Sequence, residues 1–145
     1  MTQRDKILRN VKDTLGASRM FKFIGDSEQD LTVDTLSRFQ TPLVVLIPGD
    51  ITQNDPVIGN AQKIRQLLPL TILIVINKTN SDEIKSLNEL EFEAKRLIYQ
   101  DRRRGVNAIT TDYQTRSSFI DLFDESVYAG FSMLFNILYT EDLTQ

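Results

Sequence analysis

The last part of the chain carries a long alternation of apolar and polar residues. From Val127 to Tyr139 every second residue is apolar, and Ser132 and Asn136 lie between these positions. A period of two is typical of a strand that buries one of its faces. The alternation therefore predicts a strand over Val127–Tyr139.

An aromatic and acidic stretch, Phe119–Glu125, precedes this strand. Phe119 and Phe123 are four residues apart, the spacing of neighbours on one helical turn. The stretch therefore predicts a packed turn or a short helix. Both aromatics, and Tyr128 after them, are candidates for the core or for an interface, where aromatic residues are enriched.

Helical spacing of apolar residues marks the segment Gln3–Leu15. Thr2 is suited to be its N-cap and Gly16 to stop it. The apolar face consists of Ile7, Leu8, Val11 and Leu15. This pattern predicts an amphipathic helix near the N-terminus.

A longer helix is predicted from Asn80 to Gly105. Asn80 can cap its first turn, and Glu83 can reach back to complete a capping box. Apolar residues follow at helical spacing as far as Ile98. Arg102–Arg104 would occupy the last turn, where positive charge favours the helix dipole, and Gly105 would end the helix.

Several short apolar segments are bounded by proline, glycine or polar residues, which predicts strands at Met20–Ile24, Leu43–Ile47, Leu70–Asn77 and Val106–Thr110. Gly25-Asp26 is expected to form the turn after the first of them. The state of Leu31–Phe39 stays open, because its alternation breaks. Asp50–Gln62 is polar and predicts a long loop or a protruding hairpin, which in a compact domain is often functional.

This order of elements predicts one α+β domain over residues 1–145. Its sheet would be mixed or mainly antiparallel, with four to five strands packed by the N-terminal helix and one long central helix. Leu70–Asn77 is apolar on both faces and is expected to be a central strand.

Composition narrows the function. The 145 residues include no cysteine and no histidine, and the net charge is −3. Disulfides, cysteine-based zinc sites and histidine-containing triads are therefore excluded. No catalytic, cofactor-binding or metal-binding residues stand out, and the protein is expected not to be an enzyme. Its apolar runs are shorter than the ~20 residues of a membrane helix, so it is expected to be soluble and unprocessed.

Two charged motifs are ambiguous. Asn77-Lys78-Thr79-Asn80 is similar to the base-recognition element of GTPases, but Asn80 replaces its aspartate and the chain has no phosphate-binding loop. A strand end followed by a helix cap explains it better. Arg102, Arg103 and Arg104 could contact phosphates, for example in a channel that DNA traverses, or could only complement a helix dipole.

The chain resembles the tail terminator and tail-completion proteins of tailed bacteriophages, within the head–tail joining, or neck, group. The residues that carry this resemblance are Phe119-Ile120-Asp121-Leu122-Phe123-Asp124, the small step Ala129-Gly130 and the strand Phe131–Tyr139. The Pro-bounded strand Thr41–Pro48 is a second match, and the order of elements agrees over most of the chain.

The resemblance implies a virion structural protein of a phage or prophage, made in the host cytoplasm and without cofactors. Such proteins form a ring, often of six copies, that caps the tail tube, ends its polymerisation and receives the head. The implied partners are further copies of the chain, tail-tube subunits and the head–tail connector or stopper, with no membrane and with nucleic acid only as passing DNA.

The predicted contact residues lie in two places. The loop Asp50–Gln62 does not align with the family, but a long polar excursion between buried strands suggests a docking element. Together with the three aromatic residues near the last strand, the predicted protein-interface residues are Asp50, Gln53, Asn54, Asp55, Phe119, Phe123 and Tyr128. The alternatives are a cellular protein-interaction or regulatory module and, from Asn77-Lys78 alone, a nucleotide-binding protein.

Overall fold

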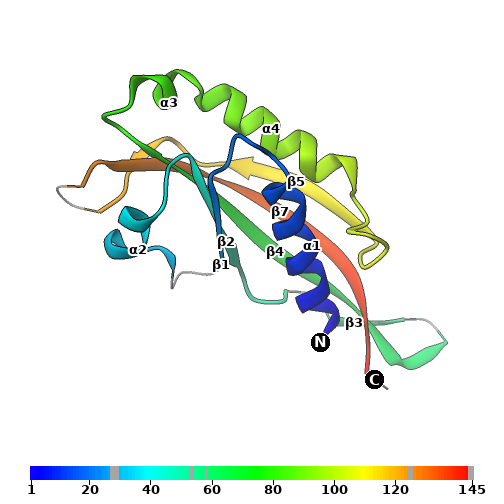
Figure 1. The fold of residues 1–145 in the computed structure, drawn as a ribbon. Helices are drawn as coiled ribbons and strands as arrows, with labels where there is room; N and C mark the ends of the chain where they lie inside the picture. Colours follow the sequence, from blue (N-terminus) through cyan, green and yellow to red (C-terminus); the bar gives the residue numbers. More distant parts are fainter. Residues whose placement is uncertain (27–29, 53, 58, 124–125, 144–145) are drawn as a thin grey trace.

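A computed structural model describes residues 1–26, 30–52, 54–57, 59–123 and 126–143 as one mixed α+β domain (Figure 1). The sheet is curved, and most of the helical mass lies along one side of it. The elements are α1 (Gln3–Gly16), β1 (Phe23–Asp26), α2 (Val33–Arg38), β2 (Leu43–Pro48), β3 (Asn54–Val57), β4 (Asn60–Asn77), α3 (Ser81–Lys85), α4 (Leu87–Gln100), β5 (Thr110–Arg116), β6 (Ile120–Asp121) and β7 (Tyr128–Asp142).

The sheet has the strand order β1-β2-β4-β7-β5, and β3 and β6 are additional short strands on β4 and β7. β1 and β2 are parallel, while the other pairings are antiparallel. The predicted α+β class is therefore confirmed. The described part of the chain has seven strands rather than four to five, because the polar excursion and the stretch Phe119–Glu125 each contribute a short one.

Two long strands, β4 and β7, form the centre of the sheet. Their pairing runs from Lys63 opposite Asp142 to Asn77 opposite Tyr128. At ~3.3 Å per residue this ladder is about 45 Å long. The predicted central strand Leu70–Asn77 is thus the second part of a longer strand, and the predicted final strand is confirmed as β7.

The main core lies between the sheet and the helices α1 and α4. Alternate residues of β4 and β7 point into it, including Leu70, Ile72, Phe131 and Phe135, all fully buried. The helices contribute Ile7, Val11, Leu15, Leu90, Ala94, Leu97 and Ile98. Alternation in β7 and helical spacing in α1 and α4 therefore reflect the same buried layer.

Tyr139 lies at one end of this core and gives the protein a pH dependence. Burial raises the pKa of its phenol above the ordinary value of 10.0, and the nearby Glu141 carboxylate acts in the same direction. A raised folded-state pKa stabilises the fold below the unfolded value and loses that contribution as pH rises through the folded value.

We therefore expect the free energy of unfolding to fall above about pH 10, the ordinary tyrosine value. Tyr139→Phe should remove this part of the fall, which urea unfolding of both proteins from pH 8 to pH 11 would measure. Parallel pH profiles for the two proteins would show that Tyr139 does not titrate differently in the folded state.

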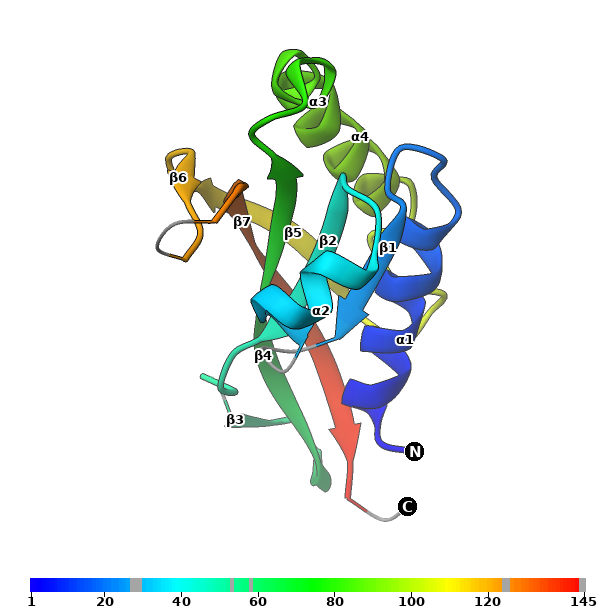
Figure 2. The same ribbon diagram turned by 60° about the vertical axis from the view of Figure 1, so that its left-hand side comes forward.

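The opposite face of the sheet is only partly covered (Figure 2). The segment Leu31–Phe39, which the sequence left open, contains the short helix α2. Thr32 caps it by accepting a hydrogen bond from the Thr35 N–H at 3.1 Å. Leu36 of α2 packs on a second, smaller cluster, whose other buried members are Leu43, Val45, Leu73 and Val75.

The N-terminal helix is confirmed, and its cap is complete. The Thr2 hydroxyl accepts from the Asp5 N–H, and the Asp5 carboxylate accepts from the Thr2 N–H, both at 3.1 Å. The helix includes Gly16 as its last residue. The predicted N-cap Thr2 is therefore confirmed, and Asp5 at the third helical position completes a capping box, a place where Glu or Gln is usual.

The predicted long helix is wrong in length. Ser86 divides it into α3 and α4, since its hydroxyl donates to the carbonyl of Asp82 at 2.8 Å. α4 ends at Gln100, before the three arginines. The chain leaves helical geometry at Asp101, with φ −139° and ψ 76°, and the φ values of 51°, 64° and 65° at Arg104, Gly105 and Val106 keep the following turn out of a helix.

Three strand boundaries also differ from prediction. Gly25-Asp26 is not a turn but the end of β1, paired with Val45-Leu46. The segment predicted as a strand at Val106–Thr110 is irregular up to Ile109, and β5 begins only at Thr110 and occupies the polar segment that follows. Phe119–Glu125 is not helical in its described part, because β6 pairs with Ala129-Gly130 of β7.

The described helices include none that is both long enough and apolar enough to cross a membrane.

Candidate functional site

The two predicted contact regions lie at opposite ends of the β4–β7 ladder. β3 pairs with the start of β4, whereas β6 pairs with the start of β7, beside the end of β4. Figure 2 shows β3 and β6 far apart along the molecule. The two regions therefore form separate surfaces rather than one site.

The polar segment Asp50–Gln62 was predicted to be a long loop or a protruding hairpin, and the structure shows a hairpin. Asn54 of β3 pairs with Gln66, and Pro56 with Ile64. The segment before β3 also follows β4, since the N–H groups of Gly49 and Thr52 donate to the carbonyls of Pro69 and Leu67 at 2.7 and 3.2 Å. The hairpin is thus a continuation of the sheet that projects beyond the helices (Figure 1).

The hairpin suits contact with another protein. Pro56 cannot donate a ladder hydrogen bond, which confines it to an edge strand. Asp50 and Asp55 are exposed. Asn54 lies in β3, and Gln53 lies outside the described residues. The predicted contact residues that the structure describes here are therefore on or beside the projecting element.

The other end presents apolar side chains to solvent. Phe119 and Phe123 are each 39% exposed, and Ile120 and Val127 between and beyond them are 53% and 40% exposed. Tyr128 is half-buried, because it packs against the small cluster under α2. We call Phe119, Ile120, Phe123 and Val127 the aromatic end.

Ile120 and Val127 were not among the predicted contact residues. Val127 was assigned to the buried face of the last strand, but β7 begins one residue later and leaves its side chain exposed. The exposure of Ile120 was not predicted, because a packed turn or a short helix was expected there. In β6 it is 53% exposed and pairs with Gly130, which has no side chain to pack on it.

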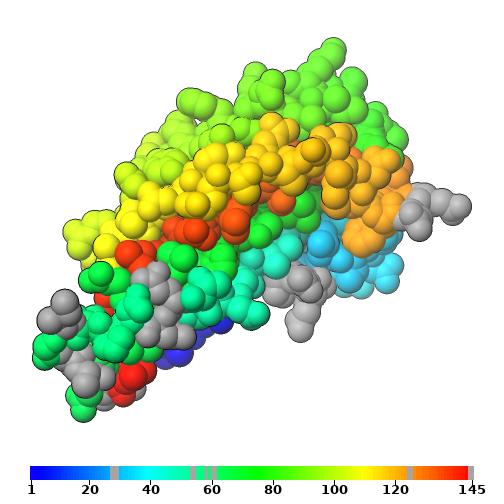
Figure 3. Space-filling view, turned by 180° about the vertical axis from the view of Figure 1, so that it is seen from behind, coloured from blue at the N-terminus to red at the C-terminus, as the bar shows by residue number. Residues whose placement is uncertain are grey.

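An open area of the sheet connects the two ends. Leu67 pairs with Leu138, and Thr71 with Leu134, on the face opposite α1 and α4. All four are half-buried, and Figure 3 shows β4 and β7 at the molecular surface between β5 and β2. Leucines at these otherwise polar positions of the β7 alternation are the sequence signal that prediction overlooked.

The arginine cluster does not act as one unit. Arg104 is fully buried, and its guanidinium donates to the carbonyls of Ile98 and Asp101. Burial also lowers the pKa of this guanidinium, which stays cationic. The prediction that Arg104 contacts phosphate is therefore wrong, because the side chain has no access to solvent.

Arg102 has a structural role at the edge of the sheet. Its guanidinium pairs with the Asp112 carboxylate and donates from Nε to the carbonyl of Thr111 at 3.3 Å. Beside it, the Tyr99 hydroxyl accepts from the Tyr113 N–H at 2.7 Å. These bonds occupy outward-facing groups of the edge strand β5. Contact of Arg102 and the exposed Arg103 with passing DNA stays a prediction.

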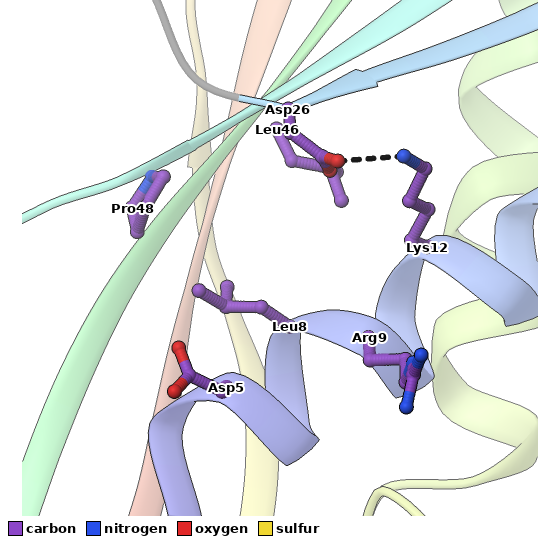
Figure 4. A pocket seen from close by; sticks show the side chains of 7 residues that line it. All are labelled: Asp5, Leu8, Arg9, Lys12, Asp26, Leu46 and Pro48. Carbon is purple, nitrogen blue, oxygen red and sulfur yellow. Dashed lines mark hydrogen bonds and ion pairs between the residues drawn. The ribbon is translucent and has the colours of Figure 1, made fainter. Parts of the chain in front are cut away.

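A hollow of about 360 Å³ lies between α1 and the β1–β2 edge (Figure 4). Its charges are balanced, since Lys12 pairs with Asp26 at 2.6 Å and the other two charged residues that line it are Asp5 and Arg9. A hydrogen bond from Thr2 lowers the pKa of Asp5, whose carboxylate already serves the helix cap. The hollow therefore offers less for recognition than the exposed surfaces above.

A scan against models of known protein families finds no match to this chain, and a search of curated proteins finds no similar protein. The candidate functional surfaces are the projecting hairpin, the aromatic end and the open sheet area between them.

Proposed function

We propose that this protein is a non-enzymatic virion protein of a phage or prophage, a tail terminator or related neck component. It would form a ring that caps the tail tube, ends tube polymerisation and provides the surface to which the head joins. One observation carries the proposal beyond the resemblance in sequence. The domain has two exposed regions, both predicted to make contacts, at opposite ends of a single strand ladder.

This geometry suits a protein that joins two different assemblies. Along β4 the level of Pro56, opposite Ile64, lies 11 residues from the level of Ile120, beside Val75, which is about 36 Å at ~3.3 Å per residue. The hairpin extends the sheet edge and is polar, whereas the aromatic end is apolar. Two surfaces of different chemistry can bind two different partners, here the last ring of tube subunits and the connector.

Ring closure would use contacts between unlike patches of neighbouring subunits. Such head-to-tail contacts close into rings when the rotation between subunits permits. The open sheet area around Leu134 and Leu138 supplies apolar surface for this purpose. A specific interface needs roughly 800 Å² per partner, and the open area would contribute part of that surface.

Shortening the hairpin is expected to abolish docking while the fold persists. Residues 55–65 would be replaced by Asn-Gly, which joins the paired residues Asn54 and Gln66 through a two-residue turn. The fold should persist because the fully buried positions of β4 begin at Leu68. Thermal unfolding would check folding, and termination of tube growth would be measured with purified tail-tube subunits.

Two outcomes would contradict different parts of this proposal. Docking by the shortened variant would show that the hairpin assignment is wrong. Failure of the intact protein to bind tube subunits or to stop tube growth would overturn the terminator assignment itself. A monomer in free solution would not overturn the terminator assignment. Proteins of this kind can be monomeric in isolation and form the ring only on the tube.

The neighbouring genes separate this proposal from its main alternative. The aromatic end would equally suit a cellular protein-interaction module. Genes for a tail-tube and a tape-measure protein should flank a terminator gene. Neighbours of cellular function only would favour the interaction module.

A further inference from the structure

A polar cleft of about 810 Å³ lies where the end of β4, the start of α3 and the segment after α2 meet. Thr41, Thr79 and Asn80 contribute polar groups to its walls, and Phe39 and Tyr128 contribute aromatic rings. It lies apart from the hairpin and has a different chemistry from the apolar aromatic end. Glu83 is the one charged residue among the described residues that line it.

Glu83 is buried in the cleft wall without a full set of partners. Its side chain is 7% exposed, and its Oε1 atom has no hydrogen-bond partner among the described residues. A buried carboxylate oxygen that lacks a donor destabilises a protein unless a binding partner supplies one. The cleft therefore has an unmet requirement for a hydrogen-bond donor, preferably a positively charged one.

The local helix cap explains why this carboxylate is available. In a capping box Glu83 would accept from the N–H of Asn80, as the sequence suggested. That N–H instead donates to the carbonyl of Asn77 at 3.0 Å. The Asn80 side chain alone caps the turn, accepting from the N–H groups of Asp82 and Glu83 at 3.0 and 3.3 Å. Glu83 is thus not needed by the helix.

The aromatic wall of the cleft favours a planar cation as the ligand. Phe39 is 41% exposed, and one face of its ring stacks on Phe23 with centroids 3.7 Å apart and planes within 5°. The ring is therefore held in a fixed orientation. A guanidinium is planar, stacks on aromatic faces and donates several hydrogen bonds to a carboxylate at once. A compact ammonium would use the carboxylate but gain less from the ring.

We propose that this cleft binds the arginine side chain of a partner protein, with the guanidinium against Phe39 and Glu83 as its acceptor. The threonine and asparagine groups of the rim would bind the backbone that presents the arginine. The cleft is lined by no cation among its described residues, so the site is complementary to arginine in charge. This inference does not depend on the assignment to a phage tail.

The test uses N-acetyl-arginine amide as the probe and two-dimensional amide NMR of the full chain as the readout. We expect saturable shifts of the Thr41, Thr79 and Asn80 amide signals. N-acetyl-citrulline amide has nearly the same shape but no charge, and should cause at most one tenth of the shift at equal concentration. Glu83→Gln should weaken arginine binding at least tenfold. The control Glu89→Gln, at an exposed position of α4, should leave it unchanged.

Two further measurements test the Phe39 ring and the Glu83 carboxylate separately. Phe39→Leu should weaken binding several-fold, since it removes the ring but keeps an apolar side chain. Glu83→Gln should also raise the melting temperature of the free protein, because it removes a buried charge that lacks a donor. Equal shifts with citrulline, unchanged binding by Glu83→Gln, or the absence of saturable shifts would overturn the proposal. Tighter binding of spermidine than of the arginine probe would identify a polyamine site instead.

Discussion

Replacing Gly130 with alanine is expected to destabilise the protein by about 3 kcal/mol, the upper part of the range for overpacked cores. A Cβ atom at this position would lie 2.1 Å from the carbonyl oxygen of Ile74 and 3.1 Å from its carbonyl carbon. Both are backbone atoms of the neighbouring central strand, so no side-chain rotation can relieve the contact. β4 and β7 would have to separate near the Asn77–Tyr128 end of their ladder.

Thermal unfolding would measure this effect, and a fall of about 10 °C in Tm is expected for a domain of this size. Gly16→Ala is the matched control. Its Cβ would meet only the Cγ1 atom of Ile24 at 3.9 Å, an ordinary contact, and alanine favours a helix over glycine. Its Tm should be unchanged or slightly higher. Similar melting temperatures for the two variants would show that β4 and β7 are not so closely apposed at Gly130.

Phe135→Ala is expected to cost about 3–5 kcal/mol, the usual range for truncating a buried aromatic. Phe135 is fully buried. Its ring packs edge-to-face with Tyr113 of β5 at 5.6 Å and with Tyr99 of α4 at 6.5 Å between centroids. The substitution would therefore leave a cavity where strand β7, the edge strand and the long helix meet, and would loosen all three.

Urea unfolding would quantify this loss, with Phe92→Ala as the control. Phe92 lies on α4 but is 67% exposed, so its truncation should change stability by less than about 0.5 kcal/mol. A destabilisation of Phe135→Ala as small as that of Phe92→Ala would mean that β5 and α4 pack independently of β7.

The sequence pattern predicted those elements whose burial is one-sided and local. α1 and β7 each bury one face, so their periods of 3.6 and 2 appear directly in the residue order. β2 and the second part of β4 are buried on both faces and appear as apolar runs. These elements define the α+β class and the central ladder, which is why the class was predictable.

Elements supported by distant side chains were not predictable in this way. β5 is largely polar, and its edge is completed by Tyr99 and Arg102, which come from the preceding helix and turn. Nothing in its own residues indicates such partners. The break at Ser86 has a similar cause, since a serine inside a helical pattern is ordinary unless its hydroxyl bonds to the backbone.

The same distinction applies to the candidate surfaces. The hairpin was predictable because a polar segment between two buried strands must leave the core. The Glu83 cleft was not, because it forms only when the segment after α2 lies beside the start of α3, far away in sequence. The sequence predicted a capping box in which the Glu83 carboxylate accepts a hydrogen bond. A carboxylate used in this way would not have been available to a ligand.

The bonds that Tyr99 and Arg102 make to β5 also limit how copies of this chain can associate. A strand from another molecule would have to displace the Tyr99 phenol and the Arg102 guanidinium before it could pair with the edge strand β5. Copies of this chain are thus protected there from growth into a continuous intermolecular sheet. Contacts between copies on that side must form through side chains, whose fit can be specific for one neighbour and one angle.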